Sequence, residues 1–445
     1  MIARAAALVL LLSSVLPLLA APAHGETLAE FYGAVREADP RLGIGAASSE
    51  VAVARSRQAL SQLLPQAAVQ AQLTRTRQER NNLFETEPVY YDGERYGITL
   101  QQSLLDWRRI RQYQSSRALL RQSTHEFAGT ASEVRFDAVD RYLTALSAAE
   151  KLRLARQEEQ TLATQRDQLQ SLFKRQMAKV TDVLTVEARA DSAQAQRLAA
   201  EAEYRVARDA LGELAGRPVE TLVGLAEDAV LPGVEVTLAA AELRSASTNA
   251  ELLARREAAE RARLEVAAEG ARRLPVLGLQ LAAQKTNIGY ENILTPRTET
   301  GVIALNASMP LFAGGALSAA THEARARQRI ADLELERATR AVQAATRAAH
   351  LRLQGLAAQA AAARRAVEST RKSVEAGERG FRLGVATLVD LLDARRDTFA
   401  AERDYAEVRH EYLRQWALLA HHEGALDDAV LERLSALFVQ PVAAP

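Results

Sequence analysis

The sequence predicts a mainly α-helical, internally duplicated protein in which each half inserts two short β-strands before a very long helix. Three observations predict this fold class. The segment TDVLTVEARAD at 181–191 returns as TLVDLLDARRD at 387–397. Alternating apolar and polar residues occur within 66–104 and again within 275–309, and the segments 107–174 and 316–378 contain no proline. A repeat of this size indicates one structural unit used twice.

The composition of the 445-residue chain narrows the class of protein. Lysine and arginine total 56 against 56 aspartate and glutamate residues, so the formal net charge is zero. The chain therefore has no overall positive charge that would attract nucleic acid. Charged residues make up 25 % and aromatic residues 5 %, a mixture that suits long helices packed through small side chains. No cysteine is present, which excludes disulfides and a lipidated cysteine.

The N-terminus, residues 1–25, has the pattern of a secretory signal peptide. Arg4 gives a basic start, residues 5–20 are almost wholly apolar, and small residues precede Glu26. We expect cleavage after Gly25; a retained anchor is the alternative, but the apolar run is short and contains Pro17. No other apolar stretch approaches the roughly 18 residues of a membrane helix. Such an exported chain would enter a membrane only as strands.

The repeat divides the mature chain into two similar halves. The first half, 26–220, is predicted to contain a helix over 26–62, strands at 66–78 and 95–104, a long helix, a hairpin turn at 176–182 and a returning helix. A connector follows at 221–245. The second half, 246–425, repeats the order with strands at 275–286 and 300–309 and a turn at 379–387, and the tail is 426–445.

The four strands have the pattern of membrane strands. In the first, Val69, Ala71 and Leu73 point one way while glutamine and threonine point the other. Each strand approaches the roughly ten residues that a tilted, bilayer-spanning strand requires. Arg75 and Lys285 share the apolar parity, but only near the loop-side ends. The alternative is a pair of half-buried hairpins on a soluble protein.

The lengths of the helices favour the membrane interpretation. Helices of about 65 residues would reach roughly 100 Å at 1.5 Å per residue, whereas globular helices average about 11–12 residues. Their apolar positions are mostly alanine and leucine, which allow close helix approach. We therefore expect coiled-coil-like arms.

Four membrane strands cannot close a barrel alone. An unpaired sheet edge is not tolerated in hydrocarbon, because each unsatisfied backbone group costs several kcal/mol. Two chains would give eight strands with a filled interior, and three would give twelve with a channel. The inward positions are small or polar, so a twelve-stranded barrel from a homotrimer is the better prediction.

The chain resembles the TolC family of outer-membrane efflux and secretion channels. The resemblance rests on ETLAEFYGAVREADPRL at the mature start, LLPQAAVQAQL, ITLQQSLLDW, ALNASMPLFAGG and FRLGVATLVDLLDARRD, and covers 26–425. It implies a trimeric tunnel with a β-barrel in the outer membrane and an α-helical barrel across the periplasm. The implied partners are a periplasmic adaptor and an inner-membrane pump, either an RND-type transporter or an ABC secretion ATPase. It also implies a passive channel, with no enzymatic chemistry and no cofactor.

The resemblance also implies an acidic entrance at the end of the helical arms. Asp390 and Asp393 match the acidic pair that rings the family's tunnel entrance and favours cations. The residues alone allow another role for Asp390, because Thr387-Leu-Val-Asp390 is a capping-box pattern at a helix start. The two roles are compatible, since residues three apart share one helix face.

Further entrance residues are carried over from the family pattern. Asp182 matches the acidic residue of the outer hairpin that helps to hold the entrance shut. Phe381 and Ala386 stand where the family has a tyrosine and an arginine that tie the inner hairpin to that outer turn. Because neither can form such a link, the closed state must be held either differently or more loosely, and Lys179 is one candidate for the missing cation.

Two other classes of protein remain as alternatives, a periplasmic adaptor and a structural coiled-coil surface protein. An adaptor has one helical hairpin and compact β-domains, and a coiled-coil protein does not need strands with one apolar face. No motif for a metal site or a phosphate-binding loop supports an enzyme. His421 and His422 are adjacent, so on a helix they point in different directions and make a poor metal pair. Gly314-Gly315 is not followed by the Lys-Ser/Thr of a phosphate-binding loop. The cargo stays open among drugs, metal ions and secreted proteins.

Overall fold

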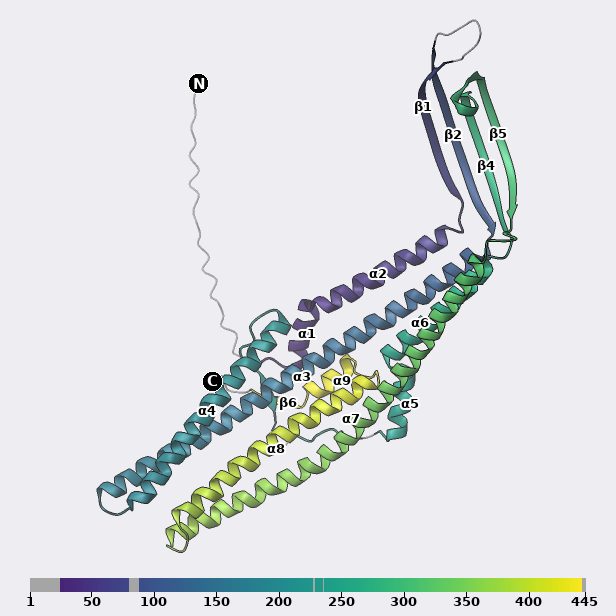
Figure 1. Ribbon diagram of the computed structural model, residues 1–445. Helices are drawn as coiled ribbons and strands as arrows, with labels where there is room; N and C mark the ends of the chain where they lie inside the picture. The colour runs from purple at the N-terminus through teal and green to yellow at the C-terminus, as the bar shows by residue number, and fades with distance from the viewer. Residues whose placement is uncertain (1–24, 80–87, 227–228, 235, 442–445) are drawn as a thin grey trace, which may run out of the picture.

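The computed structural model describes residues 25–79, 88–226, 229–234 and 236–441. These residues form an elongated molecule with a four-stranded sheet at one end and long helical hairpins at the other (Figure 1). The mainly α, duplicated fold with four strands in one sheet is confirmed. The predicted signal peptide lies outside the described residues except for Gly25. Among the helices that are described, none combines the length and apolarity needed to cross a membrane.

Each half of the chain presents the same order of elements. The first half comprises α1 (Leu28–Ala38), α2 (Pro40–Ser61), β1 (Gln66–Gln78), β2 (Val89–Leu105), α3 (Trp107–Lys174) and α4 (Val180–Ala215). The second comprises α5 (Leu238–Thr248), α6 (Ala250–Ala271), β4 (Val276–Ile288), a 3-10 turn (Tyr290–Asn292), β5 (Leu294–Ser308), α7 (Ala316–Arg382) and α8 (Leu388–His422). Between and after them lie β3 (Val223–Leu225), α9 (Asp428–Ser435) and β6 (Phe438–Pro441).

The opening helix of each half is broken in two, where the residue pattern predicted one continuous helix. Instead of one helix over 26–62, α1 ends before Asp39, whose side chain accepts a hydrogen bond from the backbone N–H of Arg41 and so caps α2. Pro40 takes the first helical position, where its missing N–H removes no helical bond. In the second half Asn249 caps α6 in the same way. Consequently α5 begins at Leu238, inside the segment that was expected to be connector.

The sheet is antiparallel throughout, with the strand order β1-β2-β4-β5. Its two outer strands, β1 and β5, each have one edge without a partner among the described residues. β2 and β5 begin about six residues earlier than predicted, because antiparallel pairing continues through charged residues. Cross-strand ion pairs accompany this extension, such as Arg297 with Glu94 at 3.1 Å.

The helices form a single curved row below the sheet. Near the sheet the order across the row is α2, α3, α6, α7, and near the hairpin ends it is α4, α3, α8, α7 (Figure 1). Successive neighbours in the lower row run in opposite directions, because each hairpin reverses the chain. The row therefore has two free edges, with α7 at one and α2 and α4 at the other.

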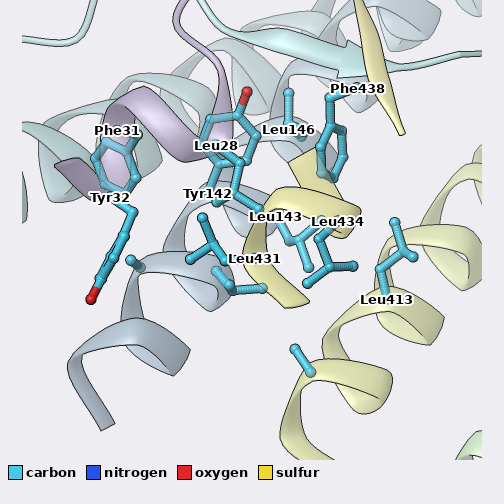
Figure 2. Close-up of a cluster of buried hydrophobic side chains, with 14 of the residues drawn as sticks. Leu28, Phe31, Tyr32, Tyr142, Leu143, Leu146, Leu413, Leu431, Leu434 and Phe438 are labelled. Atoms are coloured by element: carbon cyan, nitrogen blue, oxygen red, sulfur yellow. The ribbon is translucent and has the colours of Figure 1, made fainter. Parts of the chain in front are cut away.

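The main hydrophobic core lies at the waist of the molecule, halfway along the helical row. Phe31 of α1, Tyr142 of α3, Leu413 of α8, Leu431 of α9 and Phe438 of β6 pack there (Figure 2). The tail returns to this core because β6 pairs with β3. The Tyr142 hydroxyl donates to the carbonyl of Val223 at 2.8 Å, and burial raises the pKa of this phenol above its ordinary value.

Candidate functional site at the hairpin tips

The candidate site lies at the far end of the molecule from the sheet, where the two long hairpins turn. The α3–α4 turn passes through Gln176, with φ 61°, and the α7–α8 turn passes through Gly384, with φ 75°. At the second turn Gly380 leaves room for the chain to return, since a Cβ there would stand 3.0 Å from that of Ala386. These two turns bring all six predicted entrance residues to one end of the molecule.

Asp390 forms the capping box that its sequence pattern predicts. The backbone N–H of Asp390 donates to Thr387 Oγ1 at 3.2 Å, and the backbone N–H of Thr387 donates to Asp390 Oδ2 at 2.9 Å. The Thr387 hydroxyl also donates to Oδ2 at 2.6 Å. That hydroxyl, followed by the backbone bond, lowers the pKa of Asp390 below its ordinary value. The carboxylate is therefore charged at neutral pH, and it is exposed.

Asp393 joins the two hairpins through an ion pair. Its Oδ1 accepts from Arg189 Nη2 on α4 at 2.8 Å, while Arg396 of its own helix stands 3.7 Å away. The side chains of Arg189 and Asp393 are 26 % and 42 % exposed. Arg189 is not among the entrance residues predicted from the sequence. Its position in the sequence repeat could have pointed to it. Arg189 in the first copy aligns with Arg395 in the second, and Arg395 forms an ion pair with Glu378.

An apolar cluster packs beneath this ion pair. Leu388 and Leu392 of α8 bury their side chains against Val183 and Val186 of α4 and Leu169 of α3. We call these five residues the tip cluster. Because its members come from both hairpins, the second hairpin is docked on the first in this structure. Higher up, Arg403 of α8 donates to Glu158 of α3 at 3.0 Å.

Comparison with known proteins places this geometry in a family. The profile of the family described as "Outer membrane efflux protein" matches residues 32–217 and 243–425. The chain belongs to the outer membrane efflux protein family. It is therefore an outer-membrane efflux or secretion channel, and neither rival class receives support.

Individual relatives agree with the family match. The chain is 30 % identical over 352 residues to the alkaline protease secretion protein AprF of Pseudomonas aeruginosa, covering 78 % of this chain and 73 % of AprF. It is 26 % identical to the outer membrane protein TolC of Vibrio cholerae, covering 94 % and 95 %. The solved structure of VceC from Vibrio cholerae has the same fold, with a TM-score of 0.76 at 16 % identity over 90 % of this chain and 97 % of that one. These relatives are channels rather than enzymes.

In this outer membrane efflux protein the other predicted entrance residues lie near the docked pair without joining it. Lys179 is the N-cap of α4 and Asp182 lies in its first turn. Within the described ranges neither side chain forms a hydrogen bond or an ion pair. Phe381 is exposed, and Ala386 lies against Gly380. The cation that reaches the second hairpin in this structure is thus supplied by Arg189.

The tips expose large apolar side chains among basic ones such as Arg175 and Arg382. Met177 and Val180 at the first turn and Leu383 and Val385 at the second are exposed, with Leu383 at 78 %. Above them a groove of about 540 Å³ runs between α3 and α8, and its lining is mostly amide and hydroxyl side chains. No cluster of histidine and carboxylate groups that could hold a metal occurs in the part of the chain that is described. His421 is packed against Phe136 and bonded to Ser132.

Proposed function

We propose that three copies of this chain form the exit duct of a tripartite export system. The duct would span the outer membrane with a shared barrel and cross the periplasm with the helical row. Its tips would meet a periplasmic adaptor and an inner-membrane pump, and conduction through it would be passive. The observation that carries this proposal is that, among the described residues, the outer strands β1 and β5 each have an unpaired edge, and no long helix packs beyond α7 or α4 in the row.

The α7 edge of the row carries a second set of small apolar side chains. Its buried set, which includes Val342, Ala349 and Leu353, packs within the chain. The exposed set recurs at alternating spacings of four and three residues, as in coiled-coil helices. We call it the α7 seam; its members are Ala344, Ala348, Leu351, Gly355, Ala358 and Ala362.

The opposite edge of the row carries a matching seam on α4. Leu184, Ala188, Ala195, Leu198 and Ala202 are exposed at the same kind of spacing, and Asp191 interrupts them. Because α4 and α7 run in opposite directions, an α7–α4 contact between two copies would continue the alternation within the row. Such a contact joins two different surfaces, which produces rings when the rotation closes.

Closure at three copies is supported by the sheet. The free edge of β5 in one copy would pair with the free edge of β1 in the next, so that every backbone group in the barrel is satisfied. Twelve strands leave an open lumen, whereas eight would fill it with side chains. Localisation in the outer membrane follows from the family. Export through a cleaved leader, without a lipid anchor, belongs to this proposal.

The duct proposal is tested by mass and conductance together. We expect the detergent-solubilised protein to have the mass of three chains by light scattering and to form discrete channels in planar bilayers. A monomeric protein that is soluble without detergent, and that forms no channels, would contradict the proposal.

A secreted protein is the cargo that the relatives favour. AprF of Pseudomonas aeruginosa and PrtF of Dickeya chrysanthemi, at 30 % and 26 % identity, are both named for the secretion of proteases. We expect this chain to restore extracellular protease in a strain that lacks its own AprF, as measured by clearing of casein. Restored resistance to small toxic compounds without restored protease would instead indicate efflux.

A further inference from the structure

We infer that Arg189 is a positioning residue that sets both the docking of the hairpins and the net charge of the duct entrance. This inference rests on the proposed duct function. The Arg189–Asp393 ion pair, called here the clamp, joins α4 of one hairpin to α8 of the other at 2.8 Å. An ion pair that joins the two hairpins can be made only while they are docked.

The clamp acts beside an apolar contact that supplies most of the docking. Leu388 and Leu392 of the tip cluster are 8 % and 2 % exposed, so their burial against the first hairpin is nearly complete. An apolar contact is not directional, whereas the Arg189 guanidinium must reach one carboxylate oxygen. The clamp therefore sets the register in which the tip cluster closes. Its loss should weaken docking without abolishing the fold.

The clamp also removes one negative charge from each copy. While docked, Asp393 is neutralised by Arg189, and the uncompensated carboxylate beside it is that of Asp390, whose hydrogen-bond partner is a neutral threonine. Arg396 of the same helix forms a longer ion pair with Asp393, at 3.7 Å, and lies closer to Asp397, at 3.2 Å, so it compensates Asp393 less than Arg189 does at 2.8 Å. Undocking would therefore expose a second carboxylate on the same helix face as Asp390.

Opening and charge are coupled by this arrangement. Of the two aspartates Asp390 and Asp393, a docked hairpin leaves one without an arginine partner from the other hairpin, and an undocked hairpin leaves two. A cation that binds the free Asp393 carboxylate has a higher affinity for the undocked state than for the docked one. Saturation with this cation must shift the docking equilibrium towards undocking by the ratio of the two affinities, because linkage between two equilibria is reciprocal. The partial exposure of both side chains allows solvent and ions to compete with the clamp.

Planar-bilayer recordings of four variants separate the two effects. Arg189→Gln should raise open probability by about two- to fivefold for each clamp lost, and should raise the K⁺/Cl⁻ permeability ratio. Asp393→Asn should raise open probability similarly but lower that ratio, because Arg189 is then uncompensated. The double variant R189Q/D393N should open readily with the selectivity of the unaltered protein. The charge swap R189D/D393R should restore the closed behaviour.

Arg396→Gln is the matched control, because it removes a nearby positive charge without touching the contact between hairpins. It should change selectivity and leave open probability unaltered. The inference fails if Arg189→Gln and Arg396→Gln open equally often, or if Arg189→Gln and Asp393→Asn shift selectivity in the same direction. Assembly is checked by the mass of each variant. If the unaltered protein itself forms no channels, the duct function fails and not the clamp.

Discussion

Asp390 combines a structural bond with an exposed charge. Its carboxylate closes the capping box with Thr387 at the start of α8, and the same carboxylate is a predicted member of the entrance ring. The two roles respond to different substitutions, because the side-chain amide of asparagine keeps an oxygen that can accept from the Thr387 backbone N–H but carries no charge.

Substitution of Thr387 and Asp390 therefore separates the cap from the charge. Thr387→Val removes the cap hydroxyl and should lower the free energy of unfolding by about 1 kcal/mol. Asp390→Asn should leave stability nearly unchanged and reduce the cation preference of the channel. Guanidinium unfolding and bilayer recordings measure the two quantities. Thr398→Val on the same helix is the control, because its hydroxyl only bonds the carbonyl of Ala394. Unchanged selectivity in Asp390→Asn would exclude this residue from the pore.

His410 provides a prediction about pH. Burial, with a smaller contribution from Arg409 and Arg414, lowers the pKa of this imidazole from 6.5 to about 4, against the opposing effects of the Ala406 carbonyl and Glu150. The unfolded chain therefore binds a proton between pH 6.5 and 4 that the folded chain does not. Stability should be unaffected by this group above pH 6.5 and should fall as the pH drops towards 4, by at most about 3 kcal/mol for each such group.

The measurement is the unfolding midpoint of the solubilised protein between pH 7.5 and 4. His410→Gln should show a shallower decline, whereas His322→Gln is a control at an exposed histidine. Equal declines in both variants would mean that His410 does not carry this dependence. His422, whose pKa is also lowered to about 4 by burial, should account for part of the remaining decline.

At the residue scale, the sequence predicts contacts between partners that are close in the chain. The Thr387–Asp390 bond follows from a spacing of three residues on one helix. The Arg189–Asp393 pair was missed because it depends on how the two hairpins pack against each other. The two residues are 204 positions apart in the chain, and the spacing rules for neighbours on one helix do not apply to them. Lys179 was the nearer candidate by position, yet in this structure its side chain does not reach the second hairpin.

At the scale of elements, the α7 seam offers a direct test of assembly. Ala358→Glu would place a charge within the seam and should abolish the multi-chain complex, because helices joined through alanine approach too closely to accept it. Ala357→Glu is the control, since this residue is exposed but lies outside both the seam and the buried set. Light scattering gives the mass, and circular dichroism checks that the helices persist. An intact complex in Ala358→Glu would exclude the seam from the interface.

The long helices and the strands were predictable because their signals are periodic. The uninterrupted, proline-free length of 107–174 indicates a helix, and the alternation around Val69 indicates a strand. The break at Asp39 was missed, although an aspartate followed by proline is a typical helix start. The early starts of β2 and β5 were missed because the alternating apolar residues begin later than the strands do. Backbone hydrogen bonds between the strands continue through the charged residues that precede the apolar stretch.

At the scale of the whole molecule, the crossing from sheet to helices exposes large apolar residues. Leu311 and Phe312, between β5 and α7, are 89 % and 88 % exposed. Their position directly after a predicted membrane strand matches the belt of apolar and aromatic residues at membrane interfaces. The double variant L311E/F312E should reduce the outer-membrane fraction of the protein several-fold. Leu383→Glu, equally apolar and exposed but at the opposite end, should not. Equal fractionation of all three proteins would contradict this placement.

The two unlike edges of the chain have a genetic consequence. A copy with a damaged α7 edge but a sound α4 edge can still attach to a normal neighbour, and the resulting ring cannot close. In a cell that makes both kinds equally, only about one ring in eight would contain three normal copies. Such an allele should therefore act dominantly, and a second lesion on the other edge of the same copy should relieve the effect.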